Sequence, residues 1–165
     1  MKIRNGFITN SSSSSFIVAF EKMPESIDEM EKVLFGDNNW HKYPYGDTEG
    51  YDSIIVAKTV FNDIKKPLTK EEMIELYSHS YFDDSILNYE NYIKSNDYET
   101  RKIEWALYDK KRKEIATEYI EKFIQENSNK TFLEFRYSDN NGAYFSALEH
   151  NGLFDKLKHI RISHH

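Results

Sequence analysis

The fold is decided by the stretch SSSSSFIVAF at residues 11–20, in which a polar run passes directly into five apolar residues. The apolar part, residues 16–20, has the length of a buried strand. Because a disordered tail does not normally continue into such a run, we expect the serines to form an ordered loop that leads into the strand.

Two more strands are expected near the other end of the chain. Residues 131–137 and 158–163 have strand patterns, and a turn and a short helix at 144–149 separate them. Strands at both ends with helices between them indicate the α+β class. We expect a small sheet of about three strands, formed by the N- and C-terminal segments and packed on one side by helices from the middle of the chain. This arrangement would bring the two ends together in a single domain spanning residues 1–165.

The middle of the chain is expected to supply the helices. Ser26 precedes a predicted helix at 27–35, where a serine side chain can accept a hydrogen bond from the first turn. Thr69 and Glu72 have the spacing of a capping box, which predicts a second helix that reaches about His79.

Three segments of the middle are less clearly patterned. Asp52 or Ser53 begins a segment with helical spacing that ends before Pro67, and its β-branched residues leave a strand as the alternative. Residues 36–50 are expected to form a loop whose aromatic side chains attach it to the body. The secondary structure of residues 81–94 is ambiguous, and one interpretation is another short helix.

The longest helix is expected to run from Asn96 or Asp97 to about Asn127. Its apolar positions form two blocks: Ile103, Ala106 and Leu107, then Ile115, Ala116, Tyr119, Ile120, Phe123 and Ile124. The inward positions between the blocks are Lys110, Lys111 and Glu114. Since no Gly or Pro marks a break, we expect a continuous helix whose middle leaves the core.

The composition excludes several kinds of protein. The 165 residues include no cysteine, which excludes a disulfide scaffold, a thiolate-bound metal and a cysteine nucleophile. No stretch approaches the roughly 20 apolar residues that span a bilayer. The first 15 residues lack the apolar core of a secretory signal. We therefore expect a cytoplasmic protein without a membrane partner.

Charge is unevenly distributed along the chain, whose net charge is −6. Residues 21–90 contain 7 Lys and Arg against 16 Asp and Glu, whereas residues 91–165 contain 13 against 12. A nucleic-acid-binding protein would present a basic face. The only basic run is KKRK at residues 110–113, which we interpret as a solvated helix face. The sequence therefore argues against a nucleic-acid partner.

The serine loop is the first candidate site. Hydroxyl and backbone N–H groups, together with guanidinium groups, suit an anion such as phosphate or a nucleotide. The candidate ligand-binding residues are Arg4, Asn10, Ser11, Ser12, Ser13, Ser14 and Arg161. The loop lacks the Gly-rich stretch and Lys-Ser/Thr pair of a phosphate loop. A polar entry into the strand is therefore the alternative.

The C-terminal segment is the second candidate site, because four of the six histidines lie in the last 16 residues. The candidate catalytic residues are Asp139, Glu149, His150 and His159. Imidazole and carboxylate groups together suit a divalent metal or proton transfer near neutral pH. The candidate metal ligands are His150, His159 and His164. Strand alternation puts His159 and His164 on opposite faces of the last strand. As an alternative to a catalytic role, Asp139 would shape a turn and Glu149 would cap the short helix.

Both ends of the chain resemble known proteins. The stretch MKIRNGFITN followed by five serines and Phe16 resembles an N-terminal signature of small uncharacterised proteins from bacteriophages and Firmicutes. FRYSDNNG at 135–142, LEH at 148–150 and HIRISHH at 159–165 are similar to the tail of such proteins. The resemblance implies a phage or prophage origin and brings no activity with it.

Two functions are carried forward from the sequence. The first is a site for a small anionic ligand or a metal ion, formed where the serine loop meets the C-terminal carboxylates and histidines. Such a site could also catalyse hydrolysis. The alternative is a non-catalytic protein that binds or inhibits a host or phage protein through its acidic, aromatic-rich first half. A Ser/His/Asp hydrolase is less favoured, because no Gly-x-Ser-x-Gly elbow exposes a serine. Whether the protein is an enzyme, and its oligomeric state, stay open.

Overall fold

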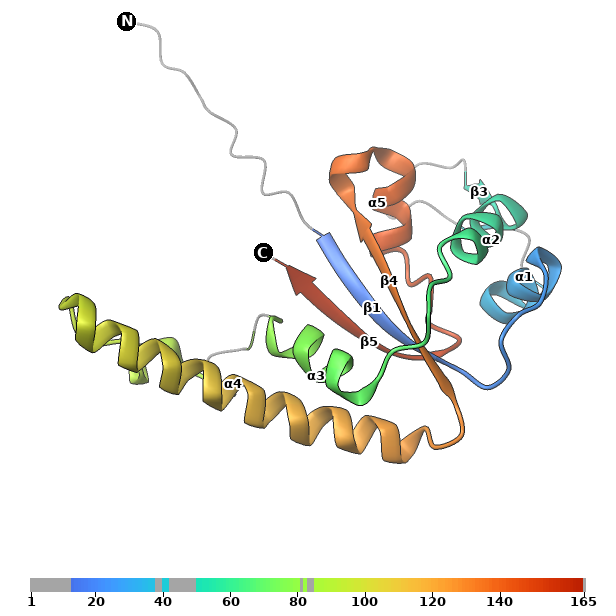
Figure 1. Cartoon of the computed structure of the whole chain (residues 1–165). Helices are drawn as coiled ribbons and strands as arrows, with labels where there is room; N and C mark the ends of the chain where they lie inside the picture. The colour runs from blue at the N-terminus through green and yellow to red at the C-terminus, as the bar shows by residue number, and fades with distance from the viewer. Residues whose placement is uncertain (1–12, 38–39, 42–49, 81, 83–84, 165) are drawn as a thin grey trace, which may run out of the picture.

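A computed structural model describes residues 13–37, 40–41, 50–80, 82 and 85–164 of the chain. Its main sheet has the strand order β4-β1-β5, with β1 (Ser13–Phe20) antiparallel to both β4 (Thr131–Ser138) and β5 (Lys158–His164) (Figure 1). The expected α+β fold is therefore confirmed, with a three-stranded sheet built from the two ends of the chain. The N-terminal segment is the central strand, and the two C-terminal strands flank it.

Strand β1 begins earlier in the serine run than the sequence indicated. Ser13, Ser14 and Ser15 already pair with residues of both neighbouring strands, so they are not part of a loop. The central position of β1 explains the difference, because a strand on each side extends the backbone pairing into the polar run. Ser14 and Ser15 are consequently buried. The candidates Arg4, Asn10, Ser11 and Ser12 lie outside the described residues.

Helices cover both faces of the sheet, not one face as expected. Alternate residues of β1, among them Phe16, Val18 and Phe20, pack in a cluster with helices α1 (Ile27–Phe35), α2 (Ser53–Asn62) and α5 (Ala143–His150). The other face carries Ile17 and Ala19, which pack against α3 (Lys70–Ser78) and α4 (Tyr98–Glu126) (Figure 1). A strand buried on both faces is apolar without alternation, which is the pattern of residues 16–20.

The helix starts follow from local capping. Ser26 accepts a hydrogen bond from the backbone N–H of Glu29, which begins α1 as predicted. Asp52 caps α2, and this confirms the helix over the alternative strand. Thr69 and Glu72 form the predicted capping box of α3, and Asp97 caps α4.

Short elements complete the described part of the chain. Strands β2 (Trp40–His41) and β3 (Tyr51–Asp52) form a separate two-stranded sheet. Their pairing was not expected, since the first of them lies in a segment predicted as a loop. Short 3-10 helices, η1 (Tyr89–Asn91) and η2 (Asp139–Asn141), lie before α4 and between β4 and α5. The first occurs in the segment that was ambiguous in the sequence.

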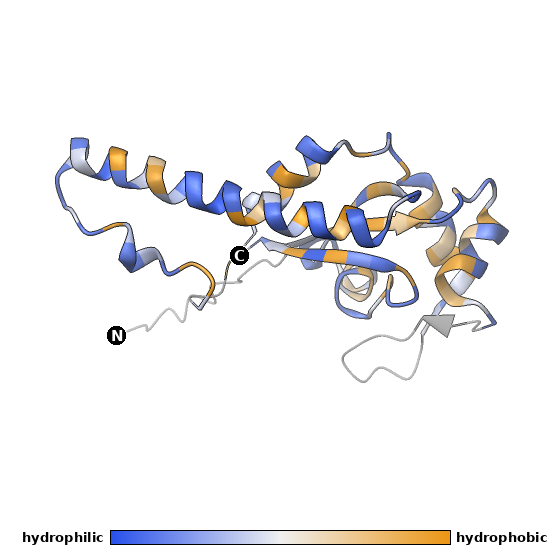
Figure 2. Cartoon of the chain, turned by 90° about the horizontal axis from the view of Figure 1, so that it is seen from below, coloured by the Kyte–Doolittle hydropathy of each residue, from blue (hydrophilic) through white to orange (hydrophobic). Residues whose placement is uncertain are grey.

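Helix α4 is continuous, as predicted, but its first half lies outside the core. Ala116 and Ile120 are buried, whereas Ile103 and Leu107 are more than half exposed, so the expected inward stripe in that half was wrong. Length explains this: 29 residues extend about 43 Å, whereas an eight-residue strand extends about 27 Å. The first half of the helix therefore projects beyond the sheet (Figures 1 and 2). Among the described helices, none is long and apolar enough to cross a membrane.

Candidate functional site

The candidate site lies where the N-terminal end of β1 meets η2 and α5. Ser14 of β1 pairs with Tyr137 of β4 and Ser163 of β5, so its side chain points to the face that α5 covers. Arg161 of β5 is opposite Phe16 and lies on the same face. Helix α5, which follows β4 after η2, brings its last two residues to this corner of the sheet.

Glu149 is the centre of the site, and its side chain is completely buried. The Ser14 hydroxyl donates a hydrogen bond of 2.9 Å to Oε1. The backbone N–H of Asp139 donates one of 3.0 Å to Oε2. Burying an ionised carboxylate is costly unless hydrogen bonds and an opposite charge compensate it. The two donors supply the hydrogen bonds, and they tie α5 to both β1 and η2.

Arg161 supplies the opposite charge. Its Nη2 lies 3.8 Å from Glu149 Oε1, and its Nε donates a hydrogen bond of 3.1 Å to the Ser14 hydroxyl. The guanidinium carbon of Arg161 lies 5.8 Å from the centre of the Phe16 ring, so the two side chains make a cation–π contact. Ser14 is therefore a relay that accepts from Arg161 and donates to Glu149, and its buried hydroxyl is committed to these two residues.

His150 completes the cluster. Its Nδ1 lies 3.2 Å from Arg161 Nη2 and its Nε2 lies 3.5 Å from Glu149 Oε2. A guanidinium group can only donate, so Nδ1 accepts and the ring proton of the neutral imidazole is on Nε2. That proton faces the buried carboxylate. The imidazole side chain is about one-quarter exposed, so it connects the buried part of the site with solvent.

Asp139, Glu149 and His150 could together hold a metal ion. Each can offer one ligating atom, and these atoms all lie within 4.8 Å of one another. Two carboxylates and one imidazole form a donor set that suits Mn²⁺, Fe²⁺ or Zn²⁺. The two acidic side chains outnumber the single guanidinium of Arg161, so the local charge favours a cation.

The other histidine candidates lie elsewhere. His159 is on the same strand face as Arg161, but its Nδ1 donates to the Leu157 carbonyl oxygen at 3.0 Å and its ring packs against Phe16 and Phe154. His164 is on the opposite face, with Nε2 3.0 Å from the Ser15 hydroxyl. The predicted alternation is thus observed, and only His150 of the three histidines joins the carboxylates.

Tyr137 lies beside the site and stays protonated at neutral pH. Burial raises the pKa of Tyr137 well above its usual value, and the nearby negative charge of Asp63 adds to the increase. The phenol is therefore not an acid–base group of the site. Its ring contributes to the apolar wall, where it contacts Phe16 and Phe145.

The sequence did not reveal the role of Arg161 as the counter-ion of Glu149. It grouped Arg161 with the serines as a binder of an external anion, because no local spacing signals a contact between a strand and a preceding helix. Comparison with known proteins gives no further guide: no family model, curated protein or solved structure matches this chain significantly. The chemistry of the site is inferred from its contacts alone.

Proposed function

We propose that this chain binds a divalent metal ion through Asp139, Glu149 and His150, and that Arg161 holds an anionic ligand next to the ion. The observation that carries the proposal is the convergence of three ligating atoms within 4.8 Å around a completely buried carboxylate. Three protein ligands leave coordination positions open for water or a ligand, which is typical of catalytic sites. A hydrolytic reaction, with metal-bound water as the nucleophile, is the activity this arrangement suits.

Arg161 controls access to His150 in this proposal. While Nδ1 accepts from Arg161 and Nε2 carries the ring proton, the neutral imidazole has no lone pair left for a metal. Metal binding therefore requires Arg161 to leave Nδ1. Its side chain is 41% exposed, so the guanidinium can turn towards solvent. There it would be free to pair with the phosphate or carboxylate group of a ligand.

Calorimetric titration with Mn²⁺ and Zn²⁺, combined with native mass measurement before and after chelation, tests the proposal. Asp139→Asn and His150→Ala should each weaken binding by about tenfold or more, since each removes a ligand. His79→Ala is the matched control, because His79 is an exposed histidine that pairs with Glu75 on α3. Binding that is absent, or that is equal in all three variants, would show that the cluster is a structural network.

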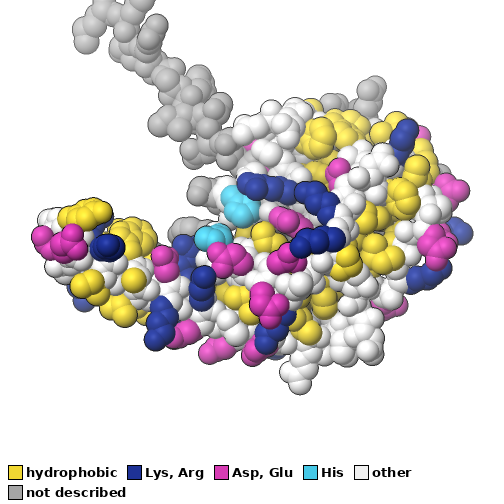
Figure 3. All heavy atoms as spheres, in the orientation of Figure 1, with side chains coloured by type: hydrophobic (Ala, Val, Ile, Leu, Met, Phe, Trp, Pro, Cys, Tyr) yellow, Lys and Arg dark blue, Asp and Glu magenta, His cyan; other side chains and the backbone are white. Residues whose placement is uncertain are grey.

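A second candidate function is supported by the free half of α4. Exposed apolar side chains gather there (Figure 3) and in the segment before it: Ile86, Tyr89, Tyr98, Ile103 and Leu107. Rings of Tyr89 and Tyr92 contact Trp105 and Tyr108, so this segment packs on the projecting helix. Such an exposed apolar surface is typical of a protein-binding site.

In this second function the protein would be phage-encoded and would bind or inhibit a host protein. Most of this surface lies on α4, outside the acidic, aromatic-rich first half of the chain that the sequence favoured. Tyr43, Tyr45, Tyr81 and the side chain of Trp40, which belong to that first half, lie outside the described residues. The basic residues 110–113 adjoin it, which favours an apolar partner surface with acidic neighbours. A photo-crosslinking residue at position 103 should form adducts in cells, whereas one at the exposed position 118 of the same helix should not. Equal labelling at both positions would contradict a specific surface.

A further inference from the structure

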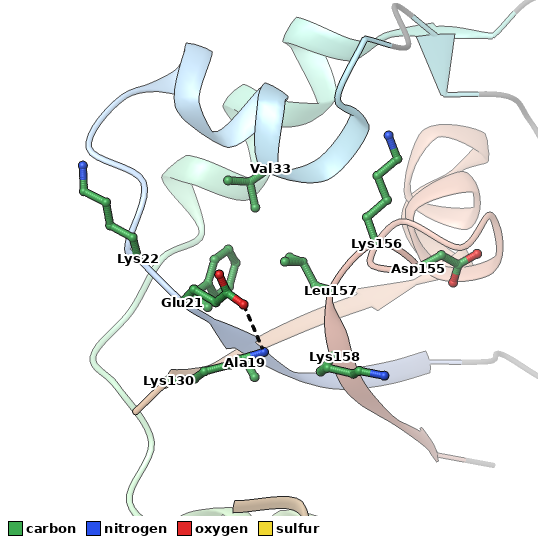
Figure 4. A pocket seen from close by; sticks show the side chains of 10 residues that line it. Ala19, Glu21, Lys22, Val33, Lys130, Asp155, Lys156, Leu157 and Lys158 are labelled. Atoms are coloured by element: carbon green, nitrogen blue, oxygen red, sulfur yellow. Dashed lines mark ion pairs between the residues drawn. The ribbon is translucent and has the colours of Figure 1, made fainter. Parts of the chain in front are cut away.

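A cavity of about 600 Å³ lies at the opposite end of the sheet from Glu149. Its walls come from the C-terminal end of β1 and the residues after it, the starts of β4 and β5, and α1 (Figure 4). Four lysines line it: Lys22, Lys130, Lys156 and Lys158. A volume of this size is in the range of small-molecule sites, about 300–1,000 Å³.

The positive charge at this cavity is only partly compensated. Lys130 pairs with Glu21 at 3.6 Å and Lys22 with Glu25 at 3.5 Å. Lys156 donates to the backbone carbonyl of Phe35, which is not an ionised group. Lys158 makes no ion pair with any residue that the structure describes. Within the described part of the chain, two ammonium groups therefore lack a carboxylate partner, although the net charge of the chain is −6.

The second acidic residue of the lining does not neutralise them. Asp155 folds back on its own loop, where a Cβ added to Gly152 would lie 2.1 Å from its Oδ2. In Figure 4 its carboxylate is directed away from the space between the lysines. In the same view the ammonium groups of Lys156 and Lys158 are also directed outward, so these flexible side chains would have to turn inward to meet an anion in the cavity.

The cavity also has apolar walls. Val33 of α1 and Leu157 of the loop before β5 point into the space between Lys22 and Lys156 (Figure 4). Phe20 and Ala19 at the end of β1 also line the cavity. A ligand that fits must combine an anionic group for the lysines with an apolar or aromatic group for these walls.

We propose that this cavity binds a small phosphate ester with an aromatic base, of the nucleoside monophosphate class. Lysine ammonium groups bind phosphate as flexible point charges, and the apolar walls provide a surface for the base. The site is separate from the metal cluster, because Ser14 and the lining residue Ala19 lie at opposite ends of β1. It does not depend on the proposed metal-dependent function.

Calorimetric titration of the whole chain with AMP, adenosine and inorganic phosphate tests this proposal. AMP should bind, and adenosine and inorganic phosphate should each bind at least about tenfold more weakly, since each lacks one of the two recognised groups. The affinity for AMP should fall as salt increases. No binding of AMP at millimolar concentration, or equal binding of AMP and inorganic phosphate, would overturn the proposal.

Lysine variants locate the site. Lys156→Met and Lys158→Met should each weaken AMP binding several-fold, and the charge reversal Lys158→Glu should abolish it. Lys122→Met on α4 is the matched control, because that lysine is exposed and pairs only with Glu126 at 3.9 Å. If Lys156→Met unfolds the chain, Lys158→Glu decides the test, because Lys158, unlike Lys156, makes no contact with the C-terminus of α1. AMP binding unchanged in Lys158→Glu would overturn the assignment.

Discussion

The two ends of strand β1 differ in how their charges are compensated. At the Ser14 end, Glu149 is completely buried and meets two hydrogen-bond donors and a guanidinium group. At the Ala19 end, four lysines line a cavity, and two of them have no carboxylate partner among the described residues. The first end is a polar network around a buried carboxylate, and the second is an open cationic surface.

This difference determines how much each end contributes to stability. A buried ionised group with all its partners in place contributes to the folded state mainly because losing any partner is costly. An exposed ammonium group costs little to remove, but it attracts an anion from solvent. Substitutions of Glu149 and its partners should therefore change stability as well as the proposed metal binding, whereas substitutions at the lysine end should change ligand binding with little effect on stability.

Glu149→Ala should have the largest effect on stability. It leaves the Ser14 hydroxyl, the Asp139 N–H and the Arg161 guanidinium without their shared acceptor, and the expected loss is about 3–5 kcal/mol. Urea unfolding measured by circular dichroism gives the free energy of unfolding. Glu118→Ala, at an exposed position of α4, should leave the midpoint unchanged. A loss below about 1 kcal/mol in Glu149→Ala would show that the buried network is not stabilising.

Arg161→Gln should have an intermediate effect, about 1 kcal/mol, because the side chain is partly exposed and its charge is screened. The same variant should bind Mn²⁺ or Zn²⁺ more tightly than the natural sequence, since the competing donor to His150 Nδ1 is gone. Unfolding and metal titration of one preparation give both values. Unchanged or weaker metal binding would contradict the role of Arg161 as a competitor.

The fold could be predicted where local chemistry decides it. Ser26, Asp52, Thr69 and Asp97 each accept a hydrogen bond from a residue two or three positions ahead, so the sequence contains the whole interaction. The pairing of β2 with β3 depends on contacts between segments and was missed. The uninterrupted apolar run at residues 16–20 indicates a strand buried on both faces of the sheet. The prediction that helices would pack on one face only was therefore wrong.

The site could be predicted only in outline. Asp139, Glu149 and His150 were expected to lie together, and they do. His159 was expected with them, but its ring packs with Phe154 on an aromatic surface that no spacing in the sequence indicates. The cationic cavity was missed entirely, because its lysines come from separate segments of the chain and none of them belongs to a basic run.

Lys156→Met at the opposite end should have a smaller effect on stability. The ammonium group donates to the carbonyl of Phe35 at the C-terminus of α1, and such a charge is worth about 0.3–1 kcal/mol. Lys158→Met, which removes a lysine without such a contact, should change the free energy of unfolding by less. If either variant destabilised the chain as much as Glu149→Ala, the proposed difference between the two ends would be wrong.

Tyr137→Phe should have the smallest effect at neutral pH and a larger one at alkaline pH. The buried hydroxyl makes no hydrogen bond of good geometry with the described residues, so its removal should leave stability at pH 7 nearly unchanged. Because burial raises the folded-state pKa of Tyr137 above the unfolded value near 10, its contribution is complete below pH 10 and is lost as pH rises towards the folded value.

Urea unfolding at pH 7 and at pH 10.5 measures this dependence. The natural sequence should lose more stability between the two pH values than Tyr137→Phe does. Tyr98→Phe is the control, since that tyrosine is largely exposed on the free end of α4 and its substitution should not alter the pH dependence. Identical pH profiles for all three proteins would mean that the Ser14 end admits solvent when the phenol ionises. The exclusion of solvent from Tyr137 would then be wrong, and the two ends of β1 would differ in charge sign alone.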